Sequence, residues 1–92
     1  MITAAEAKLK TNDVLYNIAR EYIANIIVPI IEDSISCGKF EAFATVANIE
    51  NATRIADIIK EILTNDTNKY AVAVSEDLNN DVLEYILRIS WN

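Results

Sequence analysis

The chain has 92 residues, 52% of them hydrophobic, and a formal net charge of −6. This length suits a single domain spanning residues 1–92, and the apolar content is too high for a disordered protein. The eight Lys and Arg residues are scattered along the chain. Because nucleic-acid binding depends on clustered cations, we expect no nucleic-acid partner.

Few side chains are suited to catalysis. The chain has no histidine and one cysteine, Cys37. Without histidine it lacks the commonest metal ligand and the usual general base at neutral pH. A lone cysteine cannot form an intrachain disulfide and fits a reducing compartment. We therefore expect no enzyme, no metal and no cofactor, with a hydrolase that uses carboxylates alone left open as an alternative.

Neither targeting nor membrane insertion is indicated. The opening sequence MITAAEAKLK lacks the long apolar segment of a signal peptide. The most apolar stretch, residues 23–35, is interrupted by Asn25, Pro29, Glu32 and Asp33. These interruptions argue against a membrane span, so we expect no membrane partner.

Two consecutive helices are predicted before the first strand. The capping box in Thr3–Glu6 predicts a short helix to about Lys10, and the polar residues 11–13 predict a break after it. A long helix is then expected over Asp13–Cys37. It should end at Gly38, the single glycine of the chain, because glycine readily adopts the left-handed conformation that ends a helix.

The predicted long helix has an unusually wide apolar side. Its central row and flanking positions are Leu15, Ile18, Tyr22, Ile26 and Ile30, with Val14, Ile23, Ile27 and Ile31 beside them. A stripe this wide exceeds what one sheet usually covers. Pro29 lacks the backbone donor that would bond to the carbonyl group of Asn25, so we expect a kink near Asn25.

Three segments of alternating polarity predict strands over residues 39–47, 69–75 and 82–91. Between the first two, residues 52–62 carry apolar side chains at helical spacing and predict a helix. The polar sequence EDLNND, residues 76–81, predicts a turn between the last two strands.

The resulting order, α-α-β-α-β-β, predicts an α+β fold. A right-handed crossover makes the first two strands parallel, and the last two form an antiparallel hairpin. We expect the third strand, the longest and most apolar, at the centre of a three-stranded mixed sheet with the helices packed mainly on one face. The alternation assigns Phe40, Ala42, Ala44 and Val46 to the helix side, and Phe43, Glu84, Ile86 and Arg88 to the other.

The only tryptophan, Trp91, lies one residue from the end of the chain. It continues the alternating row of Leu83, Tyr85, Leu87 and Ile89, so we expect its indole to cover the end of the core. Removing residues 90–92 should then lower the melting temperature by several degrees or prevent folding.

Three features resemble functional motifs without completing them. EDLNND lacks the glycine and the final glutamate of a calcium-binding loop. Cys37 has no histidine to activate it as a nucleophile. The tyrosines have no interleaved basic residues, which favours core or interface roles over base stacking; they are Tyr16, Tyr22, Tyr70 and Tyr85.

Several short sequences occur together along almost the whole chain. They are the opening TAAEA, the turn CGKF after the long helix, and the ending ISW. In these motifs the chain resembles a group of small proteins encoded by tailed bacteriophages. The resemblance implies a viral origin and transfers no catalytic residues. The chain departs from the group pattern in carrying Pro29 and in having fewer Lys and Glu residues along the long helix.

Surplus apolar surface indicates an interface. The residues expected to form it are Ile26, Ile27, Ile30, Ile31, Phe43 and Ile86. The primary hypothesis is therefore a non-enzymatic phage accessory protein in the host cytoplasm. It would self-associate, most simply as a dimer, and bind a host or viral protein, which it could inhibit. A monomer whose first helix covers the surplus is the alternative.

Two further functions stay open. A counter-defence protein could sequester a small nucleotide signal between protomers, with cations meeting its phosphates. The candidate cations are Arg20, Lys39, Arg54 and Arg88. A virion or assembly component would instead use the apolar surface against other structural proteins.

Overall fold

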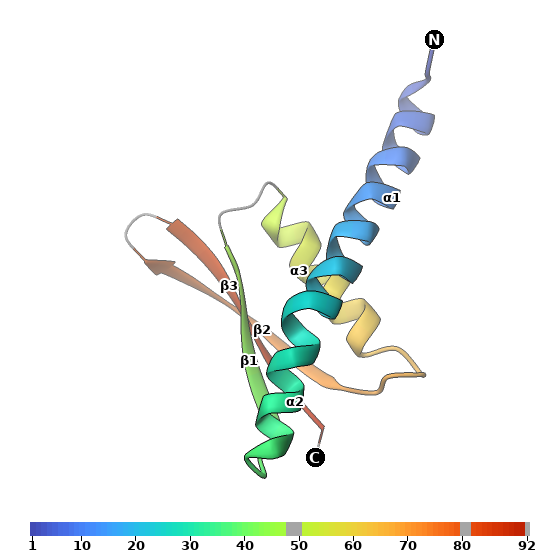
Figure 1. Ribbon diagram of the computed structural model, residues 1–92. Helices are drawn as coiled ribbons and strands as arrows, with labels where there is room; N and C mark the ends of the chain where they lie inside the picture. The colour runs from blue at the N-terminus through green and yellow to red at the C-terminus, as the bar shows by residue number, and fades with distance from the viewer. Residues whose placement is uncertain (48–50, 80–81, 92) are drawn as a thin grey trace.

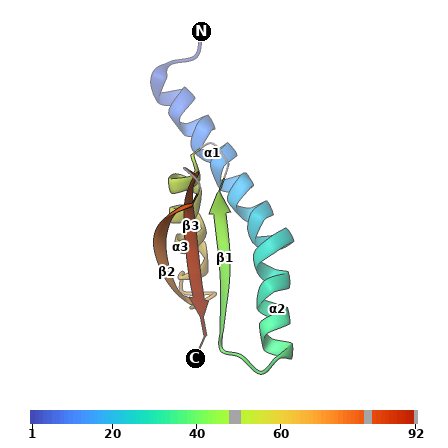
Figure 2. The ribbon, with the colours of Figure 1, turned by 90° about the vertical axis from the view of Figure 1, so that its left-hand side faces the viewer.

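The computed structural model describes residues 1–47, 51–79 and 82–91. It forms a three-stranded sheet with its helices on one face (Figures 1 and 2). The elements in chain order are α1 (Ala4–Tyr22), a π-helical turn η1 (Ile23–Ile27), α2 (Val28–Ser36), β1 (Glu41–Ala47), α3 (Ala52–Leu63), β2 (Ala71–Asn79) and β3 (Val82–Ser90).

The α+β class and the central third strand are confirmed. The strand order is β1-β3-β2, and β3 pairs with both neighbours in antiparallel orientation. The first two strands are therefore parallel to each other, as predicted. The sheet is nevertheless antiparallel at both pairings and not mixed, because β3 separates the two parallel strands.

The predicted break at residues 11–13 is wrong. Helix α1 runs through these residues without interruption. Thr11 and Asp13 are exposed, so their side chains face water. Their low helix propensity then reduces the stability of the helix only slightly. At the N-terminus the predicted cap is present, since the Thr3 hydroxyl accepts a hydrogen bond from the Glu6 amide at 3.2 Å.

The disturbance predicted near Asn25 takes the form of the π-helical turn η1. Here the Val28 N–H donates to the carbonyl oxygen of Ile23, five residues back. A π-turn inserts one extra residue into the helix and shifts the side chains that follow it. Consequently Ile27 and Ile31 are buried, while Ile26 is 42% exposed.

Gly38 ends the long helix as predicted. Its φ is +74°, in the region that glycine adopts without strain. The Gly38 amide bonds to the carbonyl oxygen of Ile35, and the Lys39 amide bonds to that of Ser34, each at 2.9 Å. This pair of bonds is a Schellman motif, which turns the chain from α2 into β1.

The core lies between the sheet and the helices. On β1 and β3 alternate residues point into it, as the period-two pattern predicted. The buried residues are Leu15, Ala19, Ile27, Ile31, Ala42, Ala44, Val46, Ile55, Ala56, Ile58, Ile59, Leu63, Tyr85, Leu87 and Ile89. Among the described residues no polar or charged side chain other than the Tyr85 phenol is buried, and that hydroxyl is hydrogen-bonded to Thr53.

Two end residues of the predicted core rows differ in the structure. Phe40 precedes β1 and is 59% exposed, and Leu83 is 43% exposed. Leu83 lies beyond Glu84, the last residue of β3 that pairs with β1. By contrast Trp91 is half-buried and packs against the core, with its ring edge-on to Tyr70 at a centroid distance of 6.1 Å. The core placement of Trp91 is therefore confirmed.

The hairpin is longer than the sequence indicated. Residues 76–79, part of the predicted turn, belong to β2, and residues 80–81 lie outside the described residues. In this extension Asp77 lies opposite Glu84. Two carboxylates directly opposite each other repel, so the extension carries an unfavourable charge pair on the open face.

The hydrogen-bond pattern of the sheet shows which residues of the edge strands β1 and β2 direct their backbone groups away from β3. The Trp91 N–H donates to the carbonyl oxygen of Phe40 at 3.0 Å. Hydrogen bonding alternates along an antiparallel strand, so every second residue counted from Trp91 along β3 bonds to β1. The residues of β3 between them bond to β2. Because both registers are unbroken, Thr45 on β1 and Val72 and Val74 on β2 direct their N–H and C=O groups outward.

The two edges of the sheet differ in their cover. At the β1 edge the Tyr22 hydroxyl donates to the carbonyl oxygen of Thr45, and α2 packs along the strand (Figure 2). Within the described ranges, β2 has an outer partner only at its entry, where the Tyr70 N–H donates to the carbonyl oxygen of Leu63 at 2.9 Å. The β1 edge is closed by a helix, and the β2 edge is open.

Replacing Tyr22 with phenylalanine should lower the stability of the fold by about 1 kcal/mol near neutral pH, the typical net value of one hydrogen bond. Burial raises the pKa of Tyr22 above 10.0, so the folded state keeps this proton where the unfolded state loses it. The contribution is complete below about pH 10 and is lost as pH rises from there through the folded pKa. Urea unfolding measured from neutral to alkaline pH should show a weaker alkaline loss in Tyr22→Phe, and identical pH slopes would contradict the assignment.

Candidate functional site

A cleft of about 800 Å³ lies where the end of α2 meets β1. The Gly38 turn brings the helix end beside the strand, and the open face of β3 forms the other wall. Its principal lining residues are Ser34, Lys39, Phe40, Glu41, Phe43 and Arg88. The cleft therefore combines two aromatic rings with charges of both signs.

Both phenylalanines of the cleft face solvent. Phe43 is 56% exposed because it lies on the open side of β1, and Phe40 is 59% exposed because it precedes the strand. Because the two exposed rings line the same cleft, they contribute to the kind of apolar surface that marks an interaction site. The sequence predicted Phe43 at an interface but assigned Phe40 to the core, and only the start of β1 at Glu41 reveals the difference.

Charges in the cleft are largely balanced. The Arg88 guanidinium lies 2.7 Å from a carboxylate oxygen of Glu41. Both side chains are well exposed, so the pair adds little stability. It orients Arg88, which lies opposite Phe43 in the strand register. Lys39 adds one further cation, leaving the cleft weakly positive.

A second group of charged residues joins α1 to α3. The Tyr16 hydroxyl donates to Glu61 at 3.0 Å, and the Arg20 guanidinium lies 5.6 Å from the Tyr16 ring centroid. The hydrogen bond to Glu61 raises the pKa of Tyr16, and the charges of Arg54 and Arg20 oppose this shift. The four candidate cations therefore form two pairs. Arg20 and Arg54 lie near Tyr16, whereas Lys39 and Arg88 line the cleft.

The predicted interface residues divide between surface and core. Ile26 and Phe43 are exposed, and Ile30 and Ile86 are half-buried. Ile27 and Ile31 are core residues, so they contribute no exposed surface. This part of the prediction fails because the π-turn changes which isoleucines face the sheet.

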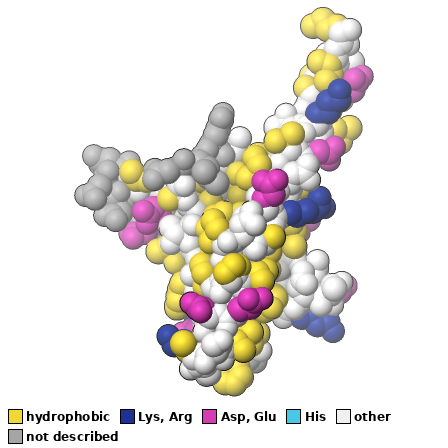
Figure 3. All heavy atoms as spheres, in the orientation of Figure 1, with side chains coloured by type: hydrophobic (Ala, Val, Ile, Leu, Met, Phe, Trp, Pro, Cys, Tyr) yellow, Lys and Arg dark blue, Asp and Glu magenta, His cyan; other side chains and the backbone are white. Residues whose placement is uncertain are grey.

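Helix α1 carries exposed apolar surface outside the set of predicted interface residues. Its N-terminal half projects beyond the sheet (Figure 1), and Leu9, Val14 and Ile18 are 66%, 56% and 39% exposed. Figure 3 shows hydrophobic side chains along the outward side of α1 and α2. Their helical spacing was visible in the sequence, but the projection of the helix was not.

The continuous helix Ala4–Ser36 is long and apolar enough to cross a membrane by length and composition, a test that core helices and signal sequences also pass. In this fold Leu15, Ala19, Ile27 and Ile31 of that helix lie in the core. Packing against the sheet therefore accounts for part of its apolar character.

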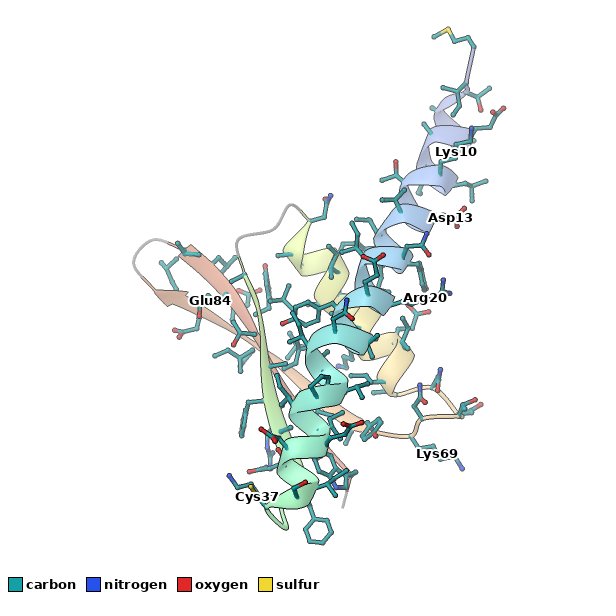
Figure 4. The ribbon with its side chains drawn as sticks, viewed as in Figure 1. Lys10, Asp13, Arg20, Cys37, Lys69 and Glu84 are labelled. Atoms are coloured by element: carbon teal, nitrogen blue, oxygen red, sulfur yellow. The ribbon has the colours of Figure 1, made fainter. Side chains whose placement is uncertain are left out.

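The described residues offer little for catalysis. Among them no group of three Cys, Asp or Glu side chains converges where a metal could bind. Cys37 is exposed at the end of α2 (Figure 4). Its neighbours in a smaller adjoining pocket include Asp33 and Lys39. The chain has no histidine, the usual base that activates a cysteine nucleophile.

No family model, curated protein or solved structure matches this chain.

Proposed function

We propose that this protein acts by binding another protein, without catalysis. The observation that carries the proposal is its surface area. The chain exposes 6340 Å², whereas a compact monomer of 10.3 kDa exposes about 5,400 Å². The excess, roughly 1,000 Å², is comparable to what one partner contributes to a standard protein interface.

The aromatic cleft is the proposed contact site for the partner. Aromatic and arginine side chains dominate the binding energy of protein interfaces. Phe40 and Phe43 provide exposed rings there, and Arg88 lies opposite Phe43 on the neighbouring strand. The salt bridge with Glu41 holds Arg88 in place, which lowers the entropy lost on binding.

The biological setting is part of the proposal. The motifs in which the chain resembles small phage proteins support a viral origin. The exposed apolar surface supports an accessory protein in the host cytoplasm that self-associates and binds a host or viral protein, which it could inhibit. The same surface would serve a virion or assembly component. Mass spectrometry of purified particles separates the two, because only the second requires copies in the virion.

A small nucleotide is the second candidate ligand. It is favoured by the convergence of Lys39 and Arg88 on one cleft, since phosphates bind where cations gather. Two features oppose it: Glu41 neutralises Arg88, and the cleft borders the C-terminal end of α2, where the helix dipole is negative. A thermal-shift screen with cyclic and linear nucleotides tests it, and absence of stabilisation would reject this candidate.

The substitution Phe43→Ser should weaken partner binding at least tenfold, because a central aromatic anchor is typically worth more than 1 kcal/mol. Affinity purification from infected cells identifies the partner, and titration of the purified pair measures the loss. Leu83→Ser is the matched control, since Leu83 is also exposed but lies away from the cleft. Equal affinities for Phe43→Ser and wild type would reject the cleft as the contact site.

A further inference from the structure

We propose that the long helix can adopt two registers after Tyr22, and that Pro29 selects the one with the π-turn. In the second register regular α-helix replaces η1, and each residue from Ile26 to the end of α2 moves into the place of the residue that follows it. This inference goes beyond the proposed function, because it concerns how the chain sets the position of α2 and, through it, the charge of the cleft.

The buried residues of the long helix are spaced one residue too far apart for a regular helix. Three turns of α-helix take about 11 residues. Leu15 and Ile27 are both buried and lie 12 residues apart. Ala19 and Ile31 repeat this spacing. The π-turn η1 lies between the members of both pairs and absorbs the additional residue.

The sequence supplies isoleucine for both registers. The residues 11 positions after Leu15 and Ala19 are also isoleucines, Ile26 and Ile30. A regular helix would bury this pair in place of the isoleucines that follow them. In the structure Ile26 is 42% exposed and Ile30 is half-buried. Exchanging identical side chains keeps the apolar surface in the core nearly constant, so burial alone does not decide between the registers.

Pro29 disfavours the regular register. It has no N–H to donate to the carbonyl oxygen of Asn25, and in a regular helix its ring presses against that carbonyl group. The π-turn spans Ile23–Ile27, so it includes Asn25 and ends two residues before the proline. The helix therefore departs from regular geometry where the clash would fall. Because burial is balanced, this local clash decides the register.

The register also determines which side chain of α2 reaches the cleft. Ser34 lies after the π-turn, is half-buried and lines the cleft together with Lys39. In the regular register Asp33 takes the place of Ser34, so a carboxylate replaces a hydroxyl group in the cleft. This negative charge offsets the cation of Lys39, and the cleft loses its weak positive charge.

The turn after α2 has room for the change. A shift by one residue carries the end of α2 about 1.5 Å further along its axis. Apart from its sequence neighbours, no atom of the described residues lies within 4 Å of the point where a Cβ at Gly38 would be. Lys39 and Phe40, which connect this turn to β1, are exposed. The connection can therefore adjust without disturbing the core.

Thiol reactivity tests the register. Cys37 is the single cysteine, so every variant carries Cys37→Ser and one new cysteine, either Ile26→Cys or Ile27→Cys. With Pro29 present, the thiol at position 26 should react with a soluble aromatic disulfide at least about tenfold faster than the thiol at position 27, because a buried thiol reacts only after local opening. Adding Pro29→Ala should reverse this order.

A second pair of positions and two controls accompany the measurement. Ile30→Cys and Ile31→Cys should show the same reversal when Pro29→Ala is added. Val28→Ala changes the neighbouring residue and keeps the proline, so it should leave the order as it is in the parent chain. Phe43→Ser lies on β1 and should also leave the order unchanged, so this inference and the role of the cleft in partner binding fail separately.

The proposal is supported only by a reversed order in a folded variant. Circular dichroism verifies that Pro29→Ala keeps its helix content, as we expect because alanine favours a helix more than proline does. An unchanged order, equal rates at positions 26 and 27, or lost helix in this variant would each overturn the proposal. Reversal in Val28→Ala would overturn it too, because the proline would then not be the cause.

Discussion

Substituting alanine for Leu87 is expected to destabilise the protein by about 3 kcal/mol, the usual cost of a cavity left by a fully buried leucine. Leu87 is 0% exposed on the central strand, where it lies opposite Ala44 and Val74. Both neighbours are small, so little can move into the space. For a domain of this size the total stability is roughly 5–14 kcal/mol, and the melting temperature should fall by roughly 12–24 °C.

Leu83→Ala provides the matched control for this measurement. The side chain is the same and lies on the same strand, but Leu83 is 43% exposed. Its replacement should cost well under half as much. Chemical denaturation of both variants measures the difference. Equal losses would show that the burial pattern assigned to β3 is wrong.

Ending the chain after Ser90 is expected to lower stability by about 2 kcal/mol and the melting temperature by roughly 8–16 °C. The truncation removes the indole of Trp91, its edge-to-face contact with Tyr70, and the hydrogen bond from its amide to Phe40. That hydrogen bond extends the pairing of β3 with β1 beyond the end of the strand. The Trp91 end of the chain therefore contributes both apolar burial and backbone pairing.

Trp91→Phe separates these contributions. It retains the backbone bond and an aromatic ring beside Tyr70, so it should lose less than half of what the truncation loses. Thermal unfolding of the two variants gives the comparison. A truncated chain with the same melting temperature as wild type would show that Trp91 does not stabilise the core.

Local patterns predicted the elements well where one face is buried. Alternation along β1 and β3 placed Ala42, Leu87 and Ile89 in the core, because a strand one residue out of phase would expose its whole apolar set. The position of Gly38 predicted the end of the long helix, because few other residues adopt its backbone conformation without strain.

The errors arose where tertiary packing overrides local preference. Polar residues at 11–13 can begin a helix, but they can also lie on the exposed side of one that continues. Residues 76–79 have the composition of a turn, yet pairing with β3 makes them strand. In both cases the deciding contacts are absent from the local sequence.

The candidate site was only partly predictable for a related reason. A helical period of 3.6 residues does not include the extra residue of the π-turn. The sequence therefore assigned Ile26, Ile27 and Ile31 alike to the interface, whereas Ile27 and Ile31 are buried and Ile26 is exposed. Phe43 was identified by strand alternation. The cleft itself depends on how the Gly38 turn positions α2 beside β1, and sequence spacing alone does not encode that arrangement.

The helix over the β1 edge also sets a limit on assembly. In the part of the chain that the structure describes, one sheet edge is covered and one is open. A covered edge offers no free backbone groups to another strand, so strand-to-strand association could use one edge of this sheet at most. Removing the cover at Tyr22 and α2 would leave two open edges, the arrangement from which open-ended fibres grow. The helix therefore protects the edge of the sheet as well as forming a wall of the core.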